Sequence, residues 1–197
     1  MADQNDLTTN VALYEEGKTV SVTTTTDGSK ERLDVSSKDV GSEYADEQIL
    51  FTSLIDTINL GTGANEKDVF LMKNPVSSGV LAKIEEYIFV TAKVSQAVVV
   101  RIYIDPTVTA DGSALAEVNK GDAIDGSAAN VTTFQSPTIS ARGTKIAVYG
   151  IPGAGESRHI EHFTLIVKED TMMLMTIEQQ SANQELATNV TWAEVPI

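Results

Sequence analysis

The chain has 197 residues, no cysteine, and 28 acidic against 14 basic side chains, which give a formal net charge of -14. This length suits one sizeable domain with its own core. The negative charge repels phosphate backbones and anionic lipid surfaces, so neither nucleic acid nor a membrane is an expected partner. Disulfides, thiolate metal sites and a cysteine nucleophile are excluded.

The first 45 residues are rich in Thr, Ser, Asp and Glu and contain few apolar side chains. Two apolar pairs, Val20/Val22 and Leu33/Val35, alternate at period two on either side of the dipeptide Asp27-Gly28. An Asp-Gly dipeptide between alternating runs is typical of a tight β-hairpin turn. We therefore predict an N-terminal hairpin or extended arm over residues 1–45.

A two-stranded hairpin is only marginally stable in water, so this arm must dock onto other protein surface. The sequence leaves two sites open, the chain's own body and a neighbouring subunit. The candidate partner-binding residues of the arm are its apolar side chains. They are Val11, Leu13, Tyr14, Val20, Val22, Leu33 and Val35.

The body, residues 46–197, reads as a succession of short strands. In Val80–Lys93 the even positions are apolar except Glu86, so one face is predicted to be buried. In Val98–Ile104 the even positions Val98, Val100, Ile102 and Ile104 repeat this pattern. Because residues 93–96 form a short connection, we predict that these two runs pair as antiparallel neighbours.

Six further runs alternate in the same way and are separated by Pro, Gly, Asn and Asp. They are Asp68–Lys73, Val131–Ile139, Thr144–Tyr149, Ile160–Lys168, Met172–Ile177 and Asn189–Val195. Gln48–Leu60 also fits a helical period, and we predict a strand there. Asp105–Asn130 is expected to be a long loop with one helical turn at Ala114–Val118. The fold class predicted is all-β, an antiparallel β-sandwich or jelly roll with an extended N-terminal hairpin.

The segment 150–157 follows an apolar strand and has the spacing of a phosphate-binding loop, but Glu156 stands where that loop needs Lys. The residues after it alternate like a strand, so the helix terminus that would bind an anion is also missing. We interpret the segment as a glycine-rich connection. No nucleotide or other cofactor is expected.

The two histidines lie in His159-Ile160-Glu161-His162. On a strand His159 and Glu161 share a face and His162 lies on the other, so the three cannot converge on one metal. Ser157 is near in sequence but lies in no nucleophile-elbow pattern. No catalytic residue and no metal site are predicted, and the chain is not expected to be an enzyme.

Two other groups of residues could bind a cation or fill the core. Asp105, Asp111, Asp122 and Asp125 could offer oxygen ligands to calcium, but their spacing does not fit an EF-hand, and solvated turn residues are the better interpretation. Met172, Met173, Met175 and Trp192 are predicted to fill the core.

Two passages resemble known proteins. Residues 11–23 with 31–35 resemble the N-terminal hairpin of structural proteins of tailed bacteriophages. Residues 69–75, with Asn74-Pro75 followed by Ser78-Gly79 and the strand to Val90, are similar to a signature in phage virion proteins of jelly-roll type. Pro75 ends one strand because it cannot donate a ladder hydrogen bond.

The resemblance implies a virion component made in the host cytoplasm, since residues 1–10 lack the pattern of a secretory signal and no apolar run is long enough to span a bilayer. The expected role is a capsid decoration protein, a homotrimer that binds the major capsid protein or other virion proteins. The alternatives are a tail, collar or fibre-base component and, further off, a carbohydrate-binding β-sandwich module.

Overall fold

The structure is a computed structural model that describes residues 18–27, 30–39, 49–61, 65–93, 97–121, 128–151, 158–161, 165–179 and 185–197. Every regular element in these ranges is a β-strand. No helix that could cross a membrane is found among them. The chain divides into two compact units, Met1–Glu43 and Tyr44–Ile197.

The first unit contains the predicted hairpin. Strands β1 (Lys18–Asp27) and β2 (Lys30–Asp39) pair antiparallel, from Lys18 opposite Asp39 to Asp27 opposite Lys30. Because alternate residues of a strand share a face, this register places all four apolar residues of the hairpin on the same face. They are Val20, Val22, Leu33 and Val35.

The described part of the body contains fourteen strands, β3 to β16. The longer ones are β3 (Leu50–Asn59), β4 (Glu66–Asn74), β5 (Val80–Lys93), β6 (Val98–Ile104), β12 (Thr144–Ile151), β15 (Thr171–Gln179) and β16 (Glu185–Pro196). The shorter ones are β7 (Thr107–Ala110), β8 (Ser113–Ala114), β9 (Val118–Asn119), β10 (Thr132–Gln135), β11 (Thr138–Ala141), β13 (Arg158–Glu161) and β14 (Leu165–Val167).

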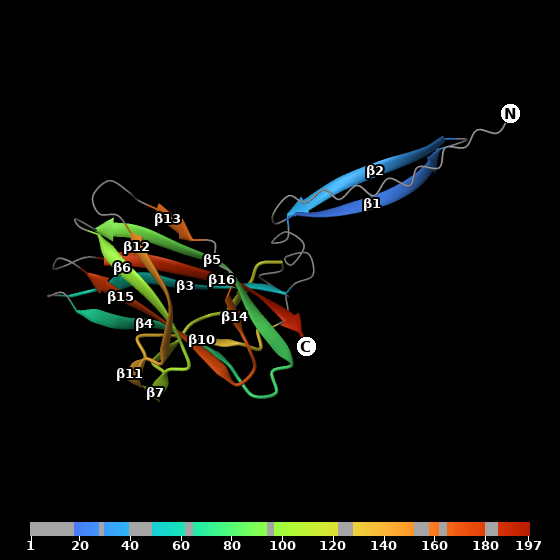
Figure 1. The fold of residues 1–197 in the computed structure, drawn as a ribbon. Helices are drawn as coiled ribbons and strands as arrows, with labels where there is room; N and C mark the ends of the chain where they lie inside the picture. Colours follow the sequence, from blue (N-terminus) through green and yellow to red (C-terminus); the bar gives the residue numbers. More distant parts are fainter. Residues whose placement is uncertain are drawn as a thin grey trace. The chain divides into compact units, whose positions relative to one another are not determined.

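Twelve of these strands form two six-stranded antiparallel sheets (Figure 1), and β7 and β11 form a two-stranded sheet of their own. One has the order β13-β5-β16-β3-β9, with β14 also on β5, and the other has the order β12-β6-β15-β4-β10-β8. If β13 and β14 are counted as one interrupted strand, eight strands can be numbered 1 to 8 in chain order: β3, β4, β5, β6, β12, β13/β14, β15 and β16. Read from neighbour to neighbour, one sheet then has the order 1-8-3-6 and the other the order 2-7-4-5. This is the strand order of an eight-stranded jelly roll, and it confirms the predicted fold class.

One predicted pairing is wrong. The runs Val80–Lys93 and Val98–Ile104 form β5 and β6, but β5 pairs with β13, β14 and β16, whereas β6 pairs with β12 and β15. They therefore lie in opposite sheets. Both strands bury one face against the same core, and crossing from sheet to sheet satisfies that requirement as well as a hairpin does.

The core lies between the two sheets and confirms most of the predicted apolar faces. Trp192 is fully buried, and its ring stacks on Phe51 of the neighbouring strand at a centroid distance of 6.0 Å. Met173 and Met175 are also fully buried, whereas Met172 is partly exposed. The tryptophan and two of the three methionines are thus core residues, as predicted.

The alternation along β5 changes face in mid-strand. Ala82 and Ile84 are buried, but beyond them the buried residues are Tyr87 and Phe89 rather than Glu86 and Ile88. The register against β16 shifts at this point, because Thr191 lies opposite Glu86 while Trp192 lies opposite Ile84. The prediction that the even positions stay buried is therefore wrong beyond Ile84, since a β-bulge inserts one extra residue.

The connection from β6 to β12 is a structured excursion. Its strands β7 and β11 pair with each other, β8 and β10 extend the sheet beside β4, and β9 pairs with β3. The predicted helical turn at Ala114–Val118 is wrong, because β8 ends at Ala114, β9 begins at Val118, and the residues between them are not helical. The predicted strand Val131–Ile139 is divided at Ser136, whose φ of 52° breaks the extended backbone.

Two buried polar side chains hold the connections in place. Glu194 of β16 is 3% exposed, and its carboxylate accepts hydrogen bonds from the backbone N–H groups of Asn130 and Val131 at 2.9 to 3.0 Å. Asn74 is 1% exposed and donates to the carbonyl groups of Val80 at 2.8 Å and Val167 at 3.0 Å. The asparagine of the Asn-Pro motif therefore ties the turn after β4 to two other strands.

Gly143, where the excursion ends and β12 begins, provides a test of this architecture. It has a φ of 78°, and a Cβ there would lie 2.2 Å from the carbonyl oxygen of Ile104. We expect Gly143→Ala to lower the free energy of unfolding by at least about 2 kcal/mol, measured by urea unfolding.

The matched control is Gly150→Ala on the same strand, where a Cβ would meet nothing within 4 Å. It should change stability by less than about 0.5 kcal/mol. Equal effects of the two substitutions would contradict the close approach of the backbone at Gly143.

Candidate functional site

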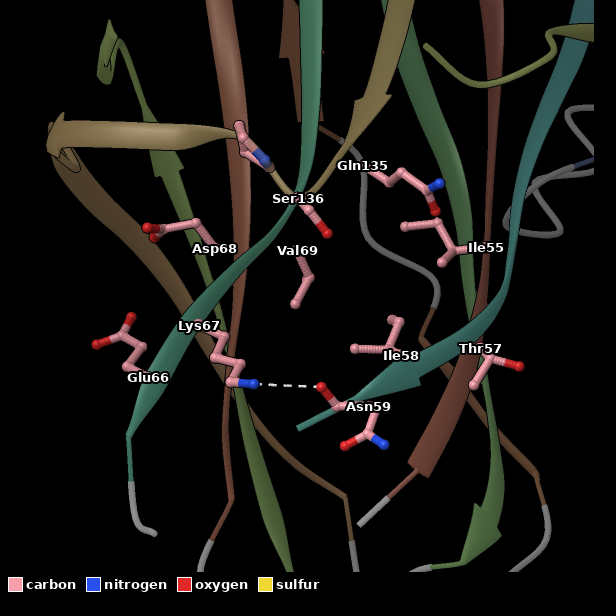
Figure 2. A pocket seen from close by; sticks show the side chains of 11 residues that line it. Ile55, Thr57, Ile58, Asn59, Glu66, Lys67, Asp68, Val69, Gln135 and Ser136 are labelled. Atoms are coloured by element: carbon pink, nitrogen blue, oxygen red, sulfur yellow. Dashed lines mark hydrogen bonds between the residues drawn. The ribbon is translucent and has the colours of Figure 1, made fainter. Parts of the chain in front are cut away.

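A pocket of about 410 Å³ opens between the two sheets, at the edge formed by β3 and β4 (Figure 2). Buried side chains line its apolar part, and half-buried and exposed polar residues form its rim. The apolar lining comprises Ile55, Ile58, Val69 and Pro137, and the polar lining Thr57, Asn59, Glu66, Lys67, Asp68, Gln135 and Ser136. None of these lining residues is aromatic, so the pocket offers no stacking platform for a sugar ring.

The acidic residues at one end of the pocket are engaged by arginines. Arg142 forms an ion pair with Glu66 at 3.0 Å and with Asp68 at 2.7 Å, and it also donates to the Glu66 carbonyl at 2.9 Å. Glu66 further accepts hydrogen bonds from Tyr103, at 2.9 Å, and from Thr176. Because Arg142 precedes β12, this network ties the end of the excursion to β4.

A second arginine extends the network across the sheet. Arg101 of β6 lies 2.5 Å from Glu178 of β15 and 3.7 Å from Glu66. Burial raises the pKa of Glu66, but the hydrogen bonds from Thr176 and Tyr103 and the charges of the two arginines outweigh it, so the pKa lies below the ordinary 4.5. The carboxylate is therefore charged at neutral pH and serves as the centre of a structural cluster.

The lining of the pocket does not assemble a catalytic set. Its hydroxyl groups belong to Thr57 and Ser136, and no histidine is among the described residues that line it. Lys67 donates its Nζ to the Asn59 carbonyl at 3.2 Å, as Figure 2 shows. The arrangement is suited to hold a small, partly apolar group, since charged residues at its acidic end are already paired with one another.

The segment 150–157 does not have the surroundings of a phosphate-binding loop. Gly150 and Ile151 belong to β12, and the chain continues as strand β13 from Arg158, with residues 152–157 outside the described part. A strand thus follows where a phosphate site needs a helix terminus. Ser157 and Glu156 lie outside the described residues.

The histidine segment is only partly described. His159 and Glu161 lie on β13, opposite Phe89 and Tyr87 of β5, and strand alternation puts them on one face. His162 lies outside the described residues. A search of the described part of the chain finds no group of three or more His, Asp or Glu side chains that could hold a metal ion.

The four aspartates weighed as calcium ligands have separate roles where they are described. Asp111 forms an ion pair with Lys73 at 3.0 Å, and Asp105, with a φ of 54°, accepts a hydrogen bond from the backbone of Met172 at 3.4 Å. Asp122 and Asp125 lie outside the described residues.

Of the candidate partner-binding residues, the register brings Val20, Val22, Leu33 and Val35 together on one face of the hairpin. Val11, Leu13 and Tyr14 lie outside the described residues. Whether these residues bind a partner remains a prediction.

One feature of the surface was not predicted from the sequence. Strand β12 lies at the edge of its sheet, and Ile146 and Val148 on it are 42% and 52% exposed. The alternation of Thr144–Tyr149 predicted a strand, but an alternating pattern does not tell an edge strand from a central one. The clusters at Glu66 and Glu194 were also missed, because their members are far apart in the sequence.

No protein-family model and no curated protein sequence matches the chain. Among solved structures, the chain is similar to the VP2 subviral particle of infectious bursal disease virus, at 14% identity over 78% of this chain and 40% of that chain, with a TM-score of 0.13. The Gt strain of the same virus gives 14% identity, 75% and 40% coverage and a TM-score of 0.13. The chain spans 40% of the length of these chains, and at such TM-scores the likeness carries no argument.

The lowered pKa of Glu66 predicts a pH dependence of stability. Its contribution is complete above the ordinary pKa of 4.5 and is lost as the pH falls through the lower folded value. We expect Glu66→Gln to lower the free energy of unfolding by about 1–3 kcal/mol at pH 7, and the difference from the wild type to shrink below pH 4.5.

The measurement is urea unfolding of both proteins from pH 7 down to pH 3. Asp56→Asn changes an exposed carboxylate on the neighbouring strand β3 and serves as the control, with little change expected. A Glu66→Gln deficit that stays constant over this range would show that the charge of Glu66 is not what stabilises the cluster.

Proposed function

We propose that the protein is a non-enzymatic structural protein of a tailed-phage virion, a capsid decoration protein that binds the major capsid protein and associates with itself. The observation that carries the proposal is the hairpin unit. Among the described residues, β1 and β2 pair only with each other, over ten residues each, and belong to the unit Met1–Glu43. Such a hairpin requires further protein surface to be stable.

The fold of the body supports the same proposal by analogy. Eight-stranded jelly rolls occur in viral coat proteins, and also in lectins and cupins. A fold alone does not determine a function, so the analogy only adds to the sequence resemblance to phage structural proteins. A tail, collar or fibre-base component would share both features and is the alternative that we keep.

Two other classes of function have less support. The pocket lining has no aromatic residue on which a sugar could stack, which disfavours a carbohydrate-binding module. The Glu66 and Asp68 carboxylates are engaged by Arg142, and no nucleophile and base are paired in the pocket. This arrangement favours a binding protein over an enzyme.

The test of decoration is to mix the purified full-length protein with undecorated heads assembled from the major capsid protein of the same genome. We expect the protein alone to have three times the monomer mass of 21.1 kDa, and the heads to gain a saturable amount of mass, both measured by mass photometry. A monomer that leaves the mass of the heads unchanged would contradict decoration and direct attention to tail components.

The hairpin face predicts which residues attachment needs. Val22 lies on the apolar face of the hairpin, and Ser21, its neighbour in the sequence, lies on the opposite face. We expect Val22→Lys to weaken binding to heads by at least roughly tenfold, because a charge on that face must be desolvated when it docks. Ser21→Lys introduces the same charge one residue away and should bind like the wild type.

Binding is measured by co-sedimentation of each variant with the heads over a range of concentrations. Circular dichroism checks that both variants remain folded. Equal binding by the two variants would remove the hairpin face from the interface.

A further inference from the structure

Strand β12 is an open edge in the part of the chain that the structure describes. It is the last strand of its sheet and pairs there only with β6. Lys145 is the one charged residue in its eight positions, and Ile146 and Val148 expose their side chains. A long edge strand with few charges is a template for pairing with another strand. The bulge at Ile146 leaves Ala147–Ile151 in regular register with β6.

The two edges of the hairpin differ in composition. Seven of the ten residues of β1 are Val or Thr, and its only charges, Lys18 and Asp27, are at its ends. Six of the ten residues of β2 are charged. β-branched residues favour pairing, and charges on an edge strand discourage it. Strand β1 is therefore the edge of the hairpin that is open to a partner.

The charges of the hairpin permit close approach to another copy of the chain. Residues 18–39 contain four basic and four acidic side chains, so their net charge is zero, and the whole charge of -14 resides in the rest of the sequence. The unit Met1–Glu43 as a whole has nine acidic and four basic side chains and the body has nineteen and ten, so two bodies repel each other more strongly than a hairpin unit and a body do.

The point at which the chain enters the body favours a neighbouring copy over the chain's own β12. The body begins at β3, which faces β4 across the pocket, and β4 is separated from β12 by β15 and β6. Within the body, the strand at which the described chain begins and the edge at β12 therefore lie on opposite sides of the sandwich. A second copy can present its hairpin to that edge whatever the path of its own chain.

We propose that strand β1 of one copy adds to the edge of β12 in a second copy, with Val20 and Val22 on the same face of the enlarged sheet as Val148. This inference rests on the self-association in the proposed function and names the surfaces that make it. Cross-strand apolar pairs stabilise such an addition. Because the two surfaces differ, the contact is head-to-tail, and three copies can close it into a ring.

The absence of cysteine from the sequence allows a direct test. Full-length chains carrying Val148→Cys are mixed with chains carrying Val20→Cys or Val22→Cys, without capsids, and oxidised mildly. We expect a disulfide-linked dimer of the two different chains for at least one of the β1 positions, since Cβ atoms on paired strands lie within about 5.5 Å. The product is identified by mass spectrometry.

The matched control is Leu54→Cys in place of Val148→Cys. Leu54 is 53% exposed, like Val148 at 52%, but it lies in the other sheet, on β3, which pairs with β16 along its length and with β9 at Phe51 and Thr52. Cross-linking that is equal for Leu54 and Val148 would overturn the proposal. So would a monomeric, intramolecular disulfide in the double variant Val22→Cys/Val148→Cys, which would show that the hairpin docks on its own body.

A second measurement does not depend on a disulfide. Val148→Lys should abolish the oligomer at concentrations at which the wild type and Leu54→Lys remain assembled, as judged by mass photometry, while thermal unfolding of the body is unchanged. Assembly by Val148→Lys would overturn the proposal. If the chains cross-link but do not bind to heads, the addition of β1 to β12 is supported and decoration is contradicted.

Discussion

The apolar interface between the two sheets is the constraint on which the other features of the body depend. Except for β6 and β12, which pair in one sheet, each of the eight jelly-roll strands lies in the opposite sheet from the one before it, so both faces of the core are built from segments distant in sequence. Trp192 near the end of the chain stacks on Phe51 near the start of the body. The core therefore forms only when the whole body is assembled, which is typical of folds dominated by non-local contacts.

This crossing makes the connections as important as the strands. Burial of the backbone N–H groups of Asn130 and Val131 without acceptors would cost hydrogen bonds. The Glu194 carboxylate provides the acceptors. The Asn74 side chain does the same for the carbonyl groups of Val80 and Val167. Buried polar groups thus fix the paths of the connections, while the apolar core fixes the layers. In the same way the arginine cluster at Glu66 attaches the end of the excursion to the sheet.

The sequence predicts the strands of this fold better than their partners. The period-two pattern located β6 correctly, with Val98, Val100 and Ile102 buried, because one face of the strand meets the core throughout. It failed in β5 beyond Ile84, since a bulge is defined by the register of the partner strand. It also could not tell that β5 and β6 lie in opposite sheets, because the same alternation suits a hairpin and a crossing.

The candidate surfaces show the same limit. The apolar face of the hairpin could be inferred because its four residues are close in sequence and alternate at period two on both strands. The edge at β12 could not be inferred from the sequence, since an edge strand is defined by the lack of a pairing strand on one of its sides. The two surfaces match in composition, because β1 carries charges only at its two ends and β12 carries a single charge, that of Lys145. Charge repulsion between two such surfaces is weaker than between two whole bodies, each of which is acidic.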